Sequence, residues 1–240
     1  MIKHLIIGLL CGLPFLVHAQ ERSKKPTRGL AFGLFAHTNG VGAEVQYHVY
    51  RDGLDFVAGL SLASLRHPQQ LKIESAYADQ GGKRYFYDKK NYGFVLAPTF
   101  GISKVLIGRD DYSRINVRTT LSGGPVLGIL KPYYLEVAIP FNGNQAYVEV
   151  DKYDANLYNF TNIVGEADYL LGIGELSVVP GINGKFATMV DFAGKNDLIR
   201  AVELSLYGTL FVRPFDLMDL TEDKSFYLGG QIAILFGDKW

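Results

Sequence analysis

The chain has 240 residues, 24 basic and 24 acidic side chains, 13% aromatic residues and 27 glycines. Because the charges balance and no polybasic segment occurs, nucleic acid is not an expected partner. The aromatic and glycine content, with no amphipathic helical stretch after residue 28, favours one all-β unit.

The first nineteen residues predict a cleaved signal peptide. Lys3 precedes an apolar run over residues 5–17, and Val-His-Ala at 17–19 fits the small-residue pattern of a cleavage site. The run is too short for a spanning helix, which needs about 20 residues. We therefore expect an exported chain with a flexible periplasmic lead-in over residues 20–28. The single cysteine, Cys11, lies in the leader, so the mature chain is expected to hold no disulfide or thiolate site.

Alternation typical of strands begins at Gly29. Residues 29–37 and 41–50 each alternate bulky apolar side chains with small or polar ones. Thr38-Asn39-Gly40 between them is a hairpin signal, because Asn and Gly tolerate positive φ. The second segment has the length that a tilted strand needs to cross a bilayer, about ten residues. A third strand is predicted over residues 54–65.

Five later segments show the same period. They cover residues 91–105, 114–130, 168–192, 198–213 and 225–240. The segment 168–192 is too long for one plain strand, and Pro180-Gly181 and Asn183-Gly184 inside it indicate a bulge, a bend or a hairpin. Eight strands is the preferred count. Ten is the alternative, if those residues form a turn and residues 145–151 form a strand.

The connections between these segments alternate in length, except that the first, Thr38 to Gly40, is short although it should face outward. Those near 51–53, 107–113 and 193–197 are short, and those near 66–90, 131–167 and 214–224 are long. Outer-membrane barrels have short periplasmic turns and long extracellular loops. Only helices and closed barrels satisfy their backbone polar groups in lipid. The sequence therefore predicts a transmembrane antiparallel up-and-down β-barrel over residues 29–240, with both termini in the periplasm.

The last sixteen residues alternate as a strand does, with a bulky apolar face and a small or weakly polar one. The chain here resembles the small outer-membrane β-barrel families of Gram-negative bacteria, the OmpA- or OmpX-like type. That resemblance implies location in the outer membrane, contact with its lipids, and recognition of the last strand by the barrel-assembly machinery. The C-terminal assembly signal would consist of Phe226, Leu228, Ile232, Ile234, Phe236 and Trp240. One departure is the final Trp240, because such families commonly end on Phe.

If the bulky faces meet lipid, the polar residues on the opposite faces meet inside the barrel. The expected interior network consists of Glu44, Gln46, His48, Arg114, Arg118 and Glu203. An eight-stranded barrel is just wide enough for side chains to fill, and an unpaired buried charge is costly. We therefore expect a plugged interior in which Glu44 or Glu203 lies within salt-bridge distance of Arg118 or Arg114.

No motif of a hydrolase, zinc protease or phosphate loop is found. His37 and His48 fall several residue pairs apart on the first hairpin, so no catalytic, cofactor or metal site is expected. The leading hypothesis is a non-enzymatic barrel whose long loops act in envelope integrity, in adhesion, or as part of a secretion or assembly complex. One alternative is a barrel hydrolase or acyltransferase that uses Ser75, His67 and Asp79. Another is a small porin or lipocalin-like carrier.

Overall fold

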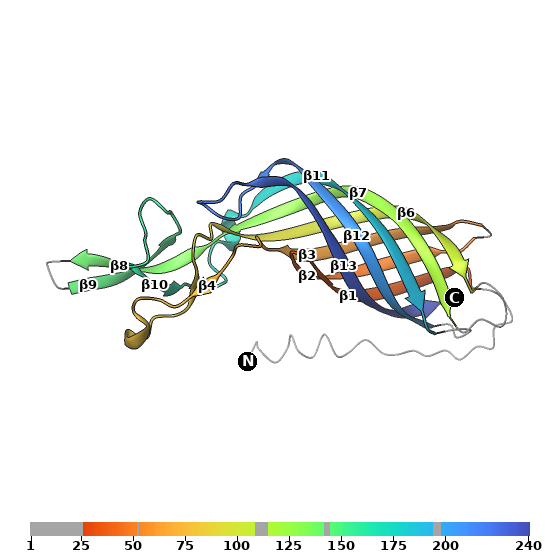
Figure 1. Ribbon diagram of the computed structural model, residues 1–240, viewed down its shortest axis with the longest axis horizontal. Helices are drawn as coiled ribbons and strands as arrows, with labels where there is room; N and C mark the ends of the chain where they lie inside the picture. Colours follow the sequence, from red (N-terminus) through yellow and green to blue (C-terminus); the bar gives the residue numbers. More distant parts are fainter. Residues whose placement is uncertain (1–25, 52, 109–114, 142–144, 194–197) are drawn as a thin grey trace.

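A computed structural model describes residues 26–51, 53–108, 115–141, 145–193 and 198–240. Eight antiparallel strands close into a barrel in the order β1-β13-β12-β11-β7-β6-β3-β2, which confirms the predicted fold class (Figure 1). The barrel strands are β1 (Arg28–His37), β2 (Gly40–Val49), β3 (Asp55–Leu65), β6 (Asn91–Ile107), β7 (Asn116–Pro132), β11 (Ser177–Asp191), β12 (Leu198–Phe215) and β13 (Lys224–Lys239). The predicted leader, residues 1–19, lies outside the described residues.

The first and last strands close the barrel. β1 pairs with β13 from Gly29 opposite Lys239 to His37 opposite Gln231, and pairs with β2 on its other side. The backbone N–H of Thr27 donates to the Trp240 carbonyl at 2.8 Å, which extends the seam. The predicted lead-in over residues 20–28 is therefore too long at its end, because Thr27 is already hydrogen-bonded to the barrel.

Successive side chains point alternately outward and inward. On β13 the outward set is Phe226, Leu228, Ile232, Ile234 and Phe236, all exposed, whereas Tyr227, Ala233 and Leu235 are buried inside. Each of the other strands also exposes a large apolar residue: Phe32, Val41, Leu60, Phe100, Leu121, Phe186 and Leu204. We call this outward-facing surface the apolar belt. The predicted orientation of the last strand is confirmed.

β11 is one continuous strand, so the bulge or hairpin predicted at residues 180–184 is wrong. It pairs without a register shift with both β7 and β12. Gly181 lets β11 and β12 pack closely and does not form a turn. A Cβ at this position would lie 2.3 Å from the Leu210 carbonyl oxygen. The strand begins at Ser177, nine residues later than predicted. The ten-strand alternative is also wrong, because the strand at Gln145–Lys152 pairs outside the barrel.

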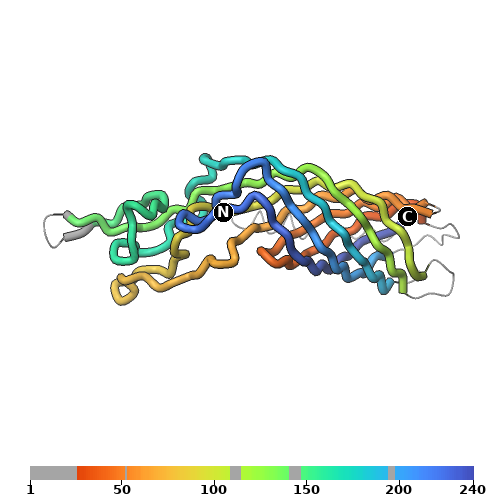
Figure 2. Tube along the Cα trace, turned by 45° about the horizontal axis from the view of Figure 1, so that its top comes forward, coloured from red at the N-terminus to blue at the C-terminus, as the bar shows by residue number. Residues whose placement is uncertain are grey.

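The long connections fold into a small unit beyond one end of the barrel, opposite the end that carries the C-terminus (Figures 1 and 2). Its elements are β4 (Lys72–Ile73), η1 (Ala78–Gln80), β5 (Tyr85–Phe86), β8 (Tyr134–Phe141), β9 (Gln145–Lys152), β10 (Ile163–Glu166) and η2 (Ile173–Glu175). We call residues 66–90 and 133–176 the distal module. Its core contains Tyr85, Tyr133, Leu135, Val137, Tyr153 and Ile163. Among the described residues, no helix is long and apolar enough to cross a membrane.

Closing the barrel requires a glycine at position 237. A Cβ there would lie 1.9 Å from the Leu30 carbonyl oxygen and 2.7 Å from the Ala31 Cα. We expect Gly237→Val to destabilise the barrel by about 3 kcal/mol, the upper range for overpacking, and to lower the folded fraction seen by circular dichroism after refolding in detergent. Gly184→Val is the matched control, because nothing lies within 4 Å of a Cβ there. Equal effects of the two substitutions would contradict the steric role of position 237.

Candidate functional site

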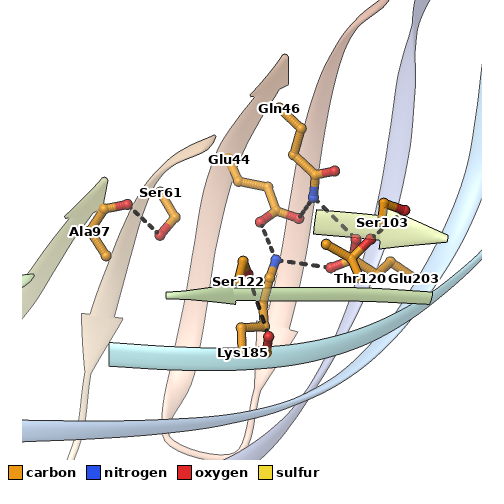
Figure 3. A network of polar contacts seen from close by, with 9 residues as sticks. All are labelled: Glu44, Gln46, Ser61, Ala97, Ser103, Thr120, Ser122, Lys185 and Glu203. Carbon is orange, nitrogen blue, oxygen red and sulfur yellow. Dashed lines mark hydrogen bonds and ion pairs between the residues drawn. The ribbon is translucent and has the colours of Figure 1, made fainter. Parts of the chain in front are cut away.

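Four polar side chains meet in the middle of the barrel, and we call them the central cluster: Glu44, Gln46, Lys185 and Glu203 (Figure 3). The Lys185 ammonium donates to Glu44 Oε2 at 3.0 Å and to Glu203 Oε1 at 2.9 Å. Gln46 Nε2 donates to the other oxygen of each carboxylate, at 3.1 Å in both cases. Glu203 is only 2% exposed. Each buried carboxylate is thus held by one cation and one amide.

The cation of this cluster differs from the predicted one. Arg118 Nη1 lies 3.8 Å from Asp55 Oδ2, and not against either glutamate. The register explains this difference. Met189 on β11 pairs with Glu203 on one side and Arg118 on the other, so Glu203 and Arg118 are two strands apart. Lys185 lies on the strand between them, and its long side chain reaches the glutamates.

Arg114, the other predicted cation, lies outside the described residues. The expected network is therefore divided. Glu44, Gln46 and Glu203 meet in the central cluster, whereas Arg118 belongs to a second pair with Asp55.

A further polar layer lies inside the barrel away from the central cluster. Lys239 forms an ion pair with Asp191. The His48 ring is buried and stacks on Tyr50, with ring centroids 5.9 Å apart and planes 10° apart. Neither ring nitrogen of His48 has a hydrogen-bond partner among the described residues. His37 lies at the opposite end of the first hairpin, and no group of three metal-binding side chains occurs in the described part of the chain.

Side chains close the interior toward the distal module. A cavity of about 80 Å³ borders the central cluster, which is room for a few water molecules. Beyond it lies a buried apolar cluster, the barrel plug: Leu65, Ala97, Val126, Leu130, Val179, Phe211, Phe215, Leu217, Met218 and Tyr227. The Phe211 and Phe215 rings stack with centroids 4.6 Å apart. Side chains thus fill most of the described interior, apart from this cavity.

The distal module holds the buried Lys89 against three aromatic faces where it joins the barrel. Lys89 Nζ lies 3.4 Å from the ring centroid of Tyr92, 4.4 Å from that of Phe86 and 5.4 Å from that of Tyr133. We call these three rings the aromatic box. Lys89 is 4% exposed. Burial lowers the pKa of Lys89 to about 7, although the nearby Glu166 carboxylate favours the charged form.

Ser75, one of the residues considered for a hydrolase, is bonded to the backbone of the distal module. Ser75 Oγ donates to the Ile163 carbonyl oxygen at 2.7 Å, which anchors the loop to β10. No described hydrogen bond joins Ser75, His67 and Asp79. Ser75 therefore has a structural role in the distal module.

Sequence reasoning missed the basic residue of the central cluster and three of the ion-pair partners. The missed residues are Lys185, Asp55, Asp191 and Lys239. The alternation of inward and outward side chains along β11 could have identified Lys185. Lys185 has the same parity as the buried Ala187 and Met189, so a continuous strand would have placed it inside.

Together these features define a closed eight-stranded barrel with an apolar outside, a polar and plugged inside, and a folded module at one end. No protein-family model and no curated protein matches the chain. Among solved structures, the crystal structure of Neisserial surface protein A (NspA) is similar, with a TM-score of 0.45 and 7% sequence identity. The similarity covers 89% of this chain and 96% of that chain. The strand pairing by itself defines the closed eight-stranded barrel.

Removing the Lys185 cation should leave two buried carboxylates uncompensated. We expect Lys185→Met to destabilise the barrel by about 3–5 kcal/mol, measured by urea unfolding in detergent. Adding Glu44→Gln and Glu203→Gln to this variant should recover most of the loss. The control is Lys152→Met, which removes an exposed ion pair with Glu175 and should leave the unfolding midpoint unchanged. A triple variant no more stable than Lys185→Met would refute the electrostatic explanation.

The buried Lys89 should make the stability of the distal module depend on pH. Its pKa is lowered from 10.5 to about 7 in the folded chain. Between these pH values the unfolded chain binds more protons, so stability should rise with pH, by up to about 1.4 kcal/mol per pH unit. We expect this in near-UV circular dichroism of the tyrosine-rich module during urea unfolding at pH 6, 8 and 10. Lys89→Met should remove the slope, and an unchanged slope in that variant would exclude Lys89 as its source.

Proposed function

We propose that this protein is a membrane-spanning barrel of the outer membrane of a Gram-negative bacterium. The apolar belt is the observation that carries the proposal. All eight strands expose large apolar side chains, whereas the charged central cluster lies inside. This distribution is the reverse of that in a water-soluble barrel, and a contiguous apolar surface of this size marks contact with lipid or a partner. A closed barrel also satisfies the backbone in lipid.

The orientation follows from the fold together with the predicted export signal. Both described chain ends lie at one end of the barrel, together with the ends of β2, β6 and β11 from which short connections leave, and the distal module lies at the other end (Figure 1). The β1–β2 turn at Thr38–Asn39 is the exception, because it is short and lies at the distal-module end. In outer-membrane barrels the short turns face the periplasm. The proposed arrangement therefore has periplasmic termini and an extracellular module, as in the OmpA- or OmpX-like type. The apolar face of β13 would be read by the barrel-assembly machinery.

The proposed role is non-enzymatic binding by the distal module, in adhesion, envelope integrity or association with an envelope complex. The barrel plug argues against transport through the barrel. The sheet order β10-β8-β9 leaves β9 at an edge, where Tyr147, Val148 and Val150 are exposed. An exposed edge strand offers unpaired backbone groups to a partner chain. This edge supports a binding role outside the cell.

Heat modifiability tests the membrane proposal. A folded outer-membrane barrel resists detergent, so the unboiled protein should migrate differently from the boiled protein in electrophoresis and should fractionate with membranes. A variant in which a short Gly-Ser linker replaces residues 136–165 should keep this behaviour, because the barrel pairings do not involve them. A soluble protein with identical migration before and after boiling would refute the proposal.

Conductance in planar bilayers tests the sealed interior separately. The barrel plug should prevent a large stable conductance in the wild-type protein. A paired variant, Phe211→Ala with Phe215→Ala, removes two stacked rings of the plug and should raise the conductance above that of wild type. Large conductance in the wild-type protein would instead favour a porin.

A further inference from the structure

The segment from Tyr169 to Leu176 lies against the outer side of the barrel, and we call it the outer flap. It covers Lys131 at the end of β7. Lys131 is adjacent to Leu130, which points into the barrel plug, so strand alternation directs Lys131 outward. Yet Lys131 is only 4% exposed. Its ammonium donates to the carbonyl oxygens of Tyr169 at 2.8 Å and Leu171 at 2.9 Å.

Aromatic rings fasten the outer flap to the strands below it. Tyr92 on β6 pairs with Lys131 on β7. The Lys131 ammonium lies 4.8 Å from the Tyr92 ring centroid and 4.7 Å from that of Tyr169. These two rings meet edge to face, with centroids 5.0 Å apart. The outward charge of Lys131 is therefore covered by carbonyl oxygens and ring faces.

The other surface of the outer flap is apolar and open. Its exposed side chains are Tyr169, Leu170, Leu171, Ile173 and Leu176, with Leu170 66% exposed. Two residues after Leu176, the exposed Val178 on β11 pairs with Ile129 of the apolar belt. The flap surface thus continues the apolar belt along the chain toward the distal module.

Several backbone N–H groups of the flap form hydrogen bonds within the flap or with the preceding Asp168. The N–H of Leu170 donates to Asp168 Oδ1 at 2.9 Å, and the N–H of Leu171 donates to the Asp168 carbonyl oxygen at 3.1 Å. The N–H of Glu175 donates to the Gly172 carbonyl oxygen at 3.0 Å. The Glu175 carboxylate is bonded to Tyr134 and paired with Lys152 of the module. Such internal bonding lowers the cost of placing this loop among apolar groups.

We infer that the outer flap inserts into the outer boundary of the lipid bilayer, where Leu170, Ile173 and Leu176 contact acyl chains and Tyr169 lies at the headgroup level. The occupant is lipid because the flap surface is continuous with the apolar belt, and tyrosine favours the membrane interface. This inference rests on the proposed membrane function. It makes the lipid-contacting surface taller over β6, β7 and β11 than over the first hairpin, and it fixes the height of the distal module above the membrane.

Spin labels on single cysteines test this placement. Cys11 is the only cysteine, so a Cys11→Ser background of the full chain accepts one label at a time. Leu170→Cys reports the flap, Leu204→Cys the apolar belt and Tyr147→Cys the edge of the distal module. In phosphatidylcholine vesicles, collisions with oxygen report lipid and collisions with a water-soluble nickel chelate report water.

The Leu204 label should be accessible to oxygen and shielded from nickel, and the Tyr147 label should show the reverse. The Leu170 label should resemble the Leu204 label but with shallower depth. A nickel-accessible Leu170 label beside a lipid-exposed Leu204 label would overturn the flap inference alone. If the Leu170 label were shielded from both reagents and showed dipolar broadening, the flap would contact a second copy of the chain. That result would also overturn the inference that the flap contacts lipid. A nickel-accessible Leu204 label would instead refute the membrane proposal.

Discussion

Closure of the sheet between β1 and β13 is the constraint on which the rest of the structure depends. An open sheet of this size would leave two strands with unpaired N–H and C=O groups, and in lipid each such group is costly. The seam runs over nine residue pairs and ends in a bond from Thr27 to the Trp240 carbonyl oxygen. With the backbone satisfied, side chains alone decide what each surface of the sheet can contact.

Closure also sets the chemistry of the inside. Eight strands enclose a space that side chains can fill, and any charged group in that space has lost its contact with water. The central cluster meets this requirement with a shared ammonium and an amide that bonds both carboxylates. The ion pairs of Arg118 and Lys239 are separate solutions to the same problem. Polar groups thus occupy the middle of the barrel, and apolar rings occupy its end next to the distal module.

The strand period was sufficient to predict the barrel, the strand count and which side of β13 faces outward. It was not sufficient for pair-specific contacts, because the partner of an inward charge depends on the register between strands. Met189 separates Glu203 from Arg118 in the ladder, and no local pattern shows that. The bulge or hairpin predicted at Pro180 to Gly184 was wrong, because glycine occurs both in turns and where two strands pack closely. The sequence alone does not separate these two uses of glycine. The distal module was missed as a folded unit because β4, β5 and β10 are only two to four residues long. Its core also combines tyrosines and aliphatic residues from segments that are far apart in the sequence.

Two features connect the barrel tightly to the distal module: a one-residue link in the chain and a shared aromatic ring. Only Tyr133 separates β7 from β8, and its N–H and C=O are both bonded, to the Lys90 carbonyl oxygen and the Tyr153 N–H. Tyr92 contacts Lys89 on the module side and Lys131 on the barrel side, so one ring serves both units. Tilting the module would separate Lys89 from the Tyr92 ring, because Tyr92 and Lys131 are paired on barrel strands and only Lys89 belongs to the module. These contacts hold the module against the end of the barrel.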